Sequence, residues 1–206
     1  MYLQLALDRL TREDCLKILE ETADSIDWIE IGTGVIKEYG MQIIREMKGL
    51  YPDKMIVADM KTCDAGKHEA LQAFNAGADI TTVMAFSANQ TILDTLEVAG
   101  QHGKRIMIDL LGVKSKERVN ELYELGADLV SLHYGKDMQK SSSFKEDAFL
   151  LTEDCPGLSV SVAGGITLDT LDTVMKKQPD ILIIGSGITG AENPGEAAAK
   201  IKEKMS

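Results

Sequence analysis

Short apolar runs rich in β-branched residues alternate with amphipathic stretches along the whole chain, at intervals of about 25 residues. The apolar runs predict eight strands, at residues 3–8, 26–32, 54–61, 79–86, 105–112, 128–135, 158–165 and 180–187. The intervening stretches carry apolar residues at three- and four-residue steps, which is typical of helices. They cover residues 14–23, 35–48, 68–75, 90–102, 116–125 and 168–176.

Eight βα units in 206 residues fit a compact barrel better than a doubly wound sheet, which seldom needs so many evenly spaced units. No Pro-rich linker or charge block divides them. Residues 75–79 and 125–128 each end a helix with glycine and begin the next strand with aspartate. We therefore predict a single-domain (β/α)8 TIM barrel over residues 1–206.

The charge and hydropathy of the chain limit its partners. A net charge of −11 and a pI near 4.8 argue against a nucleic acid or an acidic membrane as the main partner, although backbone N–H groups can still bind a small anion. No apolar run approaches the roughly 18 residues that span a bilayer, and the N-terminus lacks a basic region with a cleavage site. We expect a cytoplasmic protein.

Three cysteines, Cys15, Cys63 and Cys155, lie far apart and in no metal-ligand spacing. Reduced thiols are therefore expected rather than a disulfide framework.

Asp59, Lys61 and Asp64 bring two carboxylates and an ammonium to the point where the third strand enters a glycine-containing loop. Alternate strand residues share a face, so Asp59 and Lys61 should point the same way, and a cation between carboxylates stays protonated. Such a lysine is suited to stabilising a developing oxyanion or enolate. The alternative interpretation is a structural ion-pair network at a strand end.

The other strand ends add more polar groups to the same mouth, because the active residues of such a barrel lie at the carboxyl ends of its strands. These groups are Asp8, Glu30, Asp109 and His133. Carboxylates that face one cavity repel each other, so Lys61 and a divalent metal are the expected compensating cations. Oxygen ligands without a His or Cys cluster favour Mg²⁺.

Glycines follow the last two strands, as Gly164 with Gly165 and as residues 185–187. They let backbone N–H groups approach an anion and match the frequent phosphate site of these barrels. The polar stretch 136–145 is either a mobile loop over the site or an ordinary surface excursion.

Taken together, several strand-end motifs resemble those of the 3-hexulose-6-phosphate synthase family, within the orotidine 5′-monophosphate decarboxylase superfamily. The motifs are Leu5-Ala6-Leu7-Asp8, residues 29–33 with Glu30, residues 58–66 with Asp59-Met60-Lys61 and Asp64, residues 108–112 with Asp109, residues 133–139 with His133, and Val162-Ala163-Gly164-Gly165. The resemblance spans essentially the whole chain. It implies a Mg²⁺-dependent aldol reaction that joins formaldehyde to ribulose 5-phosphate, in a homodimer whose active sites are shared.

The resemblance also implies a role for each residue. Glu30 and Asp59 would ligate Mg²⁺, Lys61 would stabilise the enediolate, and His133 would remove the proton next to the carbonyl. Asp64 would reach the neighbouring subunit's site. Asp8 and Asp109 would position Lys61 and the substrate hydroxyls. The phosphate would be bound by Gly164, Gly165, Gly185 and Ser186.

A second enzyme of the superfamily, 3-keto-L-gulonate-6-phosphate decarboxylase, is the main alternative. That family has Glu where Asp109 stands and Arg where Lys136 and Ser186 stand. Asp109 supports the synthase and Ser186 lacks the decarboxylase's phosphate arginine, whereas Lys136 fits neither pattern.

Two alternatives belong to other classes. A non-catalytic sugar-phosphate sensor could use the same barrel, but it would gain little from keeping a base, an acid cluster and a metal site together. A Schiff-base aldolase with Lys61 as nucleophile would need an unprotonated amine, and the neighbours of Lys61 are acidic.

Overall fold

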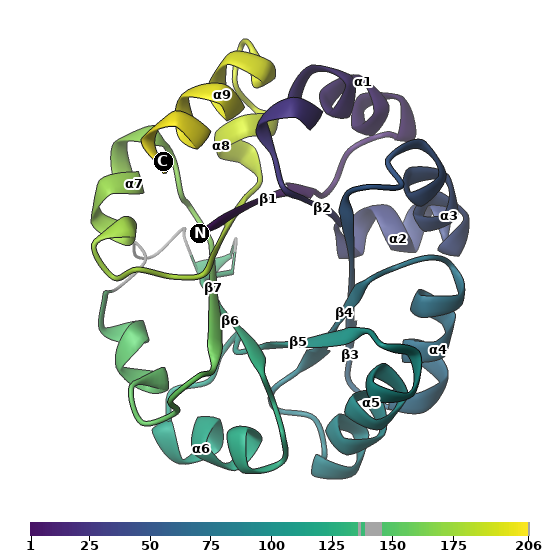
Figure 1. Ribbon diagram of the computed structural model, residues 1–206, viewed down its shortest axis with the longest axis vertical. Coiled ribbons are helices and arrows are strands. Elements are labelled where there is room, and N and C mark those ends of the chain that lie inside the picture. The colour runs from purple at the N-terminus through teal and green to yellow at the C-terminus, as the bar shows by residue number, and fades with distance from the viewer. Residues whose placement is uncertain (136, 139–145, 206) are drawn as a thin grey trace.

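The structure is a computed structural model that describes residues 1–135, 137–138 and 146–205. Eight parallel strands close into a barrel in sequence order, with β1 beside β8 and helices around the outside (Figure 1). The strands are β1 (Tyr2–Leu7), β2 (Trp28–Ile31), β3 (Met55–Thr62), β4 (Ile80–Met84), β5 (Arg105–Asp109), β6 (Leu129–His133), β7 (Ser159–Ala163) and β8 (Ile181–Ile184). The predicted (β/α)8 fold class is confirmed.

The helices connect successive strands and cover the outer face of the barrel (Figure 1). They are α1 (Arg12–Thr22), η1 (Ala23–Ser25), α2 (Thr33–Tyr39), α3 (Met41–Leu50), α4 (Gly66–Asn75), α5 (Asn89–His102), α6 (Lys116–Glu124), η3 (Glu146–Thr152), α7 (Leu168–Met175), α8 (Ser186–Thr189) and α9 (Pro194–Lys204). Within the described ranges, none of them is long and apolar enough to cross a membrane. Cys15 and Cys155 are buried, Cys63 is exposed, and all three are free thiols.

Several predicted elements differ from the structure in their bounds; the strand expected over 105–112, for example, is β5 and ends at Asp109. The single helix expected over 35–48 is divided into α2 and α3, because Gly40 adopts a positive φ of 63° that a continuing α-helix does not allow. The last strand was expected to run to residue 187, but β8 ends at Ile184 and Ser186 begins the short helix α8. The chain thus leaves the sheet just where the glycines allow it to turn.

The strands separate two apolar layers. Leu3, Leu5 and Leu7 of β1 belong to the large buried cluster between the barrel and its helices. A second, smaller cluster fills the barrel lumen and includes Trp28 and Met107. Because side chains fill the lumen, the barrel has no channel through it. Its open end is a cavity with a closed floor, as is general for this fold.

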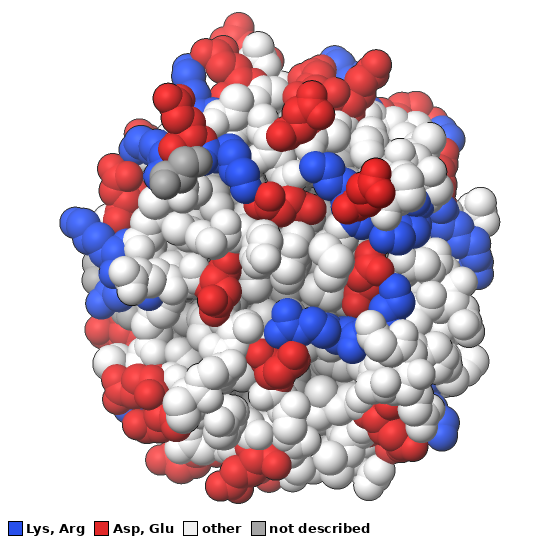
Figure 2. Space-filling model, viewed as in Figure 1, with Lys and Arg blue, Asp and Glu red and all other residues white. Residues whose placement is uncertain are grey.

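Aspartates just before two strands accept backbone N–H groups from the neighbouring strand. The carboxylate of Asp79 accepts the backbone N–H of Ile56 on the neighbouring strand at 3.0 Å, and it pairs with Lys48 at 2.9 Å and Lys104 at 2.7 Å. Asp180 likewise accepts a backbone N–H from β7 at 2.8 Å. Figure 2 shows acidic and basic side chains interspersed over one face of the molecule.

Candidate active site

A cavity of about 670 Å³ opens at the carboxyl ends of the strands. The sequence-predicted residues that line it are Asp8, Glu30, Asp59, Lys61, Asp109, His133, Gly164, Gly165, Gly185 and Ser186. Asp64 does not line the cavity, and it is exposed on the loop between β3 and α4. The fold therefore brings every one of these predicted residues to a single mouth except Asp64.

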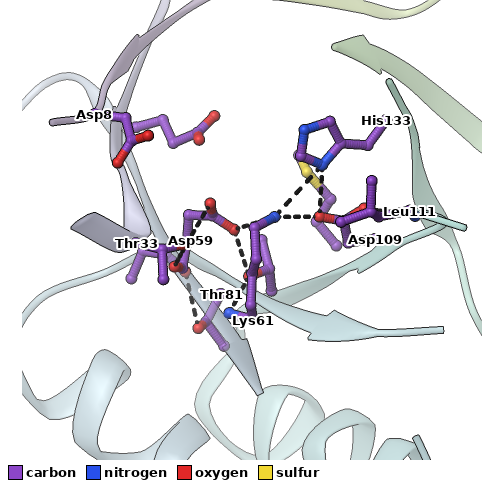
Figure 3. A network of polar contacts seen from close by, with 12 residues as sticks. Asp8, Thr33, Asp59, Lys61, Thr81, Asp109, Leu111 and His133 are labelled. Atoms are coloured by element: carbon purple, nitrogen blue, oxygen red, sulfur yellow. Dashed lines mark hydrogen bonds and ion pairs between the residues drawn. The ribbon is translucent and has the colours of Figure 1, made fainter. Parts of the chain in front are cut away.

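Lys61 lies at the centre of the acidic cluster (Figure 3). Its Nζ is 3.3 Å from Oδ1 of Asp59, donates to Oδ2 of Asp109, and lies 3.5 Å from Nδ1 of His133. Burial alone would lower the pKa of Lys61, but the charges of Asp59 and Asp109 outweigh it and raise the pKa above its usual value. The amine is therefore held as an ammonium, which is unfavourable for a Schiff-base nucleophile.

The backbone of β3 is irregular where it carries Lys61. The pairing with β4 shifts between Ala58 and Thr62, and Lys61 has a left-handed φ of 49°. Its N–H donates to the hydroxyl of Thr82 at 2.8 Å. A strand irregularity of this kind redirects a side chain, and such features are common beside active sites.

Asp109 and His133 form a hydrogen-bonded pair. Oδ2 of Asp109 lies 2.9 Å from Nδ1 of His133, and Oδ1 accepts the N–H of Leu111 at 2.8 Å. Burial of Asp109 opposes ionisation, but the hydrogen bond and charge of His133, with the charge of Lys61, lower the pKa of Asp109 to about 2. In the neutral imidazole, Nδ1 of His133 carries the hydrogen that the ionised carboxylate accepts, and Nε2 has the lone pair needed by a base.

Two threonine hydroxyls fix the orientation of Asp59. Thr33 donates to Oδ2 at 2.8 Å (Figure 3), and Thr82 donates to Oδ1 at 2.8 Å. Sequence reasoning gave these threonines no role. Thr82 lies in β4 beside Thr81, and threonine is so common in strands that this signal is weak.

Glu30 and Asp59 are the residues that could hold a divalent cation. Burial, and then the charge of Asp59, raise the pKa of Glu30 to about 8, so Lys61 does not fully compensate the acids. An added cation would offset this repulsion, and an oxygen-only donor set suits Mg²⁺. In the described part of the chain, no group of three or more His, Cys, Asp or Glu side chains is arranged for a metal. Two protein carboxylates nevertheless agree with the way Mg²⁺ binds, with substrate and water supplying other oxygens.

Asp8 accepts a hydrogen bond from the first turn of α2. Its Oδ1 accepts the N–H of Gly34 at 2.9 Å, and its Oδ2 pairs with Arg9 at 3.1 Å. A Cβ on Gly34 would lie 2.7 Å from Oδ1 of Asp8, so glycine allows this close approach. No described contact joins Asp8 to Lys61; the role expected for Asp8 toward the substrate stays a prediction.

The glycines after β7 and β8 line the cavity across the barrel from β3 and β4. Gly164 has a φ of 116°, and a Cβ there would lie 2.2 Å from the carbonyl oxygen of Tyr134. Only glycine fits this position, and the bare backbone is accessible to a ligand. Lys136 and most of the stretch 136–145 lie outside the described residues.

A family model for the orotidine 5′-phosphate decarboxylase / HUMPS family matches residues 1–201. The chain belongs to this family. Among curated relatives of this family member, the 3-hexulose-6-phosphate synthases of Bacillus subtilis (strain 168) and Mycobacterium gastri are each 37% identical, and each match covers 98% of both chains.

Solved structures agree with this assignment. A 3-hexulose-6-phosphate synthase structure has a TM-score of 0.94 at 36% identity and covers 100% of both chains. The synthase from Salmonella typhimurium has a TM-score of 0.97 at 34% identity, covering 100% of this chain and 98% of the other. The 3-keto-L-gulonate-6-phosphate decarboxylase from Vibrio cholerae is 26% identical with a TM-score of 0.88, and the match covers 99% of this chain and 96% of the other. This member of the family is an enzyme of the carbon–carbon lyase type.

Proposed function

We propose that this enzyme condenses formaldehyde with D-ribulose 5-phosphate to give D-arabino-hex-3-ulose 6-phosphate, through an enediolate. The observation that carries the proposal is the Lys61–Asp109–His133 arrangement in a chain 37% identical to synthases over 98% of its length. It supplies an oriented base and a fixed cation beside one cavity, as proton abstraction next to a carbonyl requires.

In this reaction His133 removes a proton from the carbon next to the substrate carbonyl through Nε2. Asp109 holds the imidazole by its hydrogen bond to Nδ1, 2.9 Å away, and stabilises the imidazolium that forms. The Lys61 ammonium stabilises the negative charge of the enediolate. The enediolate carbon then forms a bond with the carbon of formaldehyde, and the aldehyde oxygen takes up a proton.

Mg²⁺ would be held by Glu30 and Asp59, and its charge would further stabilise the oxygens of the sugar. The hydroxyls of Thr33 and Thr82 keep both oxygens of Asp59 in place for this purpose. Loss of activity in EDTA, restored by Mg²⁺, is the expected result. Activity that persists in EDTA would contradict the metal assignment.

The phosphate of the sugar would lie against Gly164, Gly165, Gly185 and Ser186, whose backbone is open to the cavity. The enzyme would act as a homodimer in which Asp64 reaches the partner's site. The exposure of Asp64, away from its own cavity, supports this arrangement.

Product analysis tests the function. The purified enzyme is incubated with ribulose 5-phosphate and formaldehyde, and in parallel with 3-keto-L-gulonate 6-phosphate. We expect the six-carbon ketose phosphate in the first reaction. Release of CO₂ in the second reaction alone would favour the decarboxylase, and binding without turnover of either substrate would favour a sensor.

A further inference from the structure

Gln4 is a buried polar residue at the base of the acidic cluster. It lies on β1 between Leu3 and Leu5, which face the helices, whereas its own side chain points into the lumen and contacts Glu30. Its Nε2 donates to Oε2 of Glu30 at 2.5 Å. Its Oε1 is fully buried and has no hydrogen-bond partner among the described residues.

The fold alone gives no reason for an amide at this position. The residues paired with Gln4 on the two neighbouring strands are the apolar Trp28 and Ile183, both part of the lumen cluster. An unpaired buried oxygen costs free energy, whereas an apolar side chain of similar size would not carry this cost. The amide therefore has a purpose other than stability.

Glu30 is the group that depends on it. Asp59 receives hydrogen bonds from two threonines and lies beside Lys61. Among the described residues, Gln4 is the one that donates a hydrogen bond to the side chain of Glu30. Without this donor, nothing described would fix the rotation of the Glu30 carboxylate at the cavity floor.

We propose that Gln4 is a positioning residue for Glu30. By holding Oε2, it directs the rest of the carboxylate toward the cavity, where Glu30 and Asp59 together form the proposed cation site. This inference rests on the proposed function, because it assigns Gln4 to the support of a Mg²⁺ ligand. Partners of this kind commonly change metal affinity when they are replaced.

The test compares Gln4→Met and Gln4→Asn with the unchanged enzyme by calorimetric titration of the metal-free protein with MgCl₂. Methionine keeps the volume but cannot donate, and asparagine keeps the amide but is one methylene too short to reach Glu30. We expect both to weaken Mg²⁺ binding about tenfold or more. Gln4→Met should keep the circular dichroism spectrum of the unchanged protein at the titration temperature, so that the weaker Mg²⁺ binding reflects the lost hydrogen bond to Glu30 and not loss of the fold.

Ser161→Ala is the matched control. Ser161 is equally buried in the lumen and donates to the carbonyl of Val130 at 3.0 Å, away from the acidic cluster. Its loss should leave Mg²⁺ binding unchanged, while Glu30→Gln gives the effect of losing the ligand itself. Unchanged affinity in both Gln4 variants, with normal binding by the unchanged enzyme, would overturn the role of Gln4. An unchanged enzyme that binds no Mg²⁺ would instead overturn the metal site and this inference together.

Discussion

The Lys61 ammonium lies 3.3 Å from the Asp59 carboxylate, although the backbone between them departs from regular strand geometry. Lys61 has a left-handed φ of 49°, and its N–H bonds to Thr82. The ion pair thus depends on a local irregularity that the barrel stabilises from the neighbouring strand. It places one ammonium group within reach of both Asp59 and Asp109.

Removal of that cation should abolish most catalysis. Lys61→Ala leaves the acids uncompensated and removes the charge that stabilises the enediolate, so we expect turnover to fall by about 10²–10³-fold or more. Exchange of the substrate proton with solvent deuterium, followed by NMR, should fall with it. The control Lys200→Ala removes an exposed lysine that pairs with Glu196, and it should behave as the unchanged enzyme. Near-normal proton exchange in Lys61→Ala would contradict the assigned role.

Thr82→Val should impair the site more than Thr81→Val. Thr82 accepts the N–H of Lys61 and donates to Asp59, so valine removes the partner of this N–H and one of the partners of the Asp59 carboxylate. Loss of such partners costs about 1–3 kcal/mol each, and we expect turnover to fall at least about tenfold. Thr81 is equally buried but bonds only to the carbonyl of Ala58 at 3.1 Å. Steady-state kinetics compare the turnover of the two variants. Equal turnover would exclude a role for the Thr82 hydroxyl.

The stability of the metal-free protein should fall as pH rises. Glu30 keeps its proton in the folded state up to a pKa of about 8, against an ordinary value of 4.5, so the folded state binds more protons between these values. Stability therefore decreases with pH across this window. Glu30→Gln removes the titrating group and should be more stable at pH 8 by on the order of 1–4 kcal/mol. Urea denaturation of both proteins in EDTA, at pH 5 and pH 8, measures the difference in their free energies of unfolding.

The control for that experiment is Glu124→Gln, which replaces an exposed glutamate on α6 and should follow the unchanged protein at both pH values. A Glu30→Gln variant with the same pH dependence as the unchanged protein would show that Glu30 titrates normally.

Gly164→Ala should be strongly destabilising. Its φ of 116° is unfavourable for alanine, and the new Cβ would meet the Tyr134 carbonyl oxygen at 2.2 Å. We expect a loss of at least about 2 kcal/mol in the free energy of unfolding. Gly100→Ala is the matched control, because nothing lies within 4 Å of a Cβ there, in helix α5. It should stabilise the protein by about 0.5–1 kcal/mol in the same denaturation assay.

Dimerisation should be needed for catalysis if Asp64 acts in the partner's site. The inactive variants Lys61→Ala and Asp64→Asn should then complement each other when they are mixed and exchange subunits. Random exchange makes about half of the dimers mixed, each with one intact site, so activity should recover to about a quarter of the unchanged level. Verified heterodimers that gain nothing over either parent would exclude the shared site.

Much of the fold followed from local pattern. The strand and helix periodicities, and glycine–aspartate turns such as 75–79, led to the eight-stranded barrel that the structure confirms. The barrel in turn predicted which strand ends meet at one mouth, so Glu30, Asp59 and His133 could be grouped from the sequence.

The tertiary structure decided the details that depend on contacts between strands. Gly40 divides α2 from α3, and the irregularity at Lys61 depends on Thr82 of β4. The sequence by itself determined the barrel and its set of strand-end residues, since periodicity and turn chemistry are local. Only the folded chain decided that Asp109 rather than Asp8 contacts Lys61, and that Gln4 contacts Glu30. These are distances between side chains on different strands, and they depend on register and packing that a local pattern does not contain.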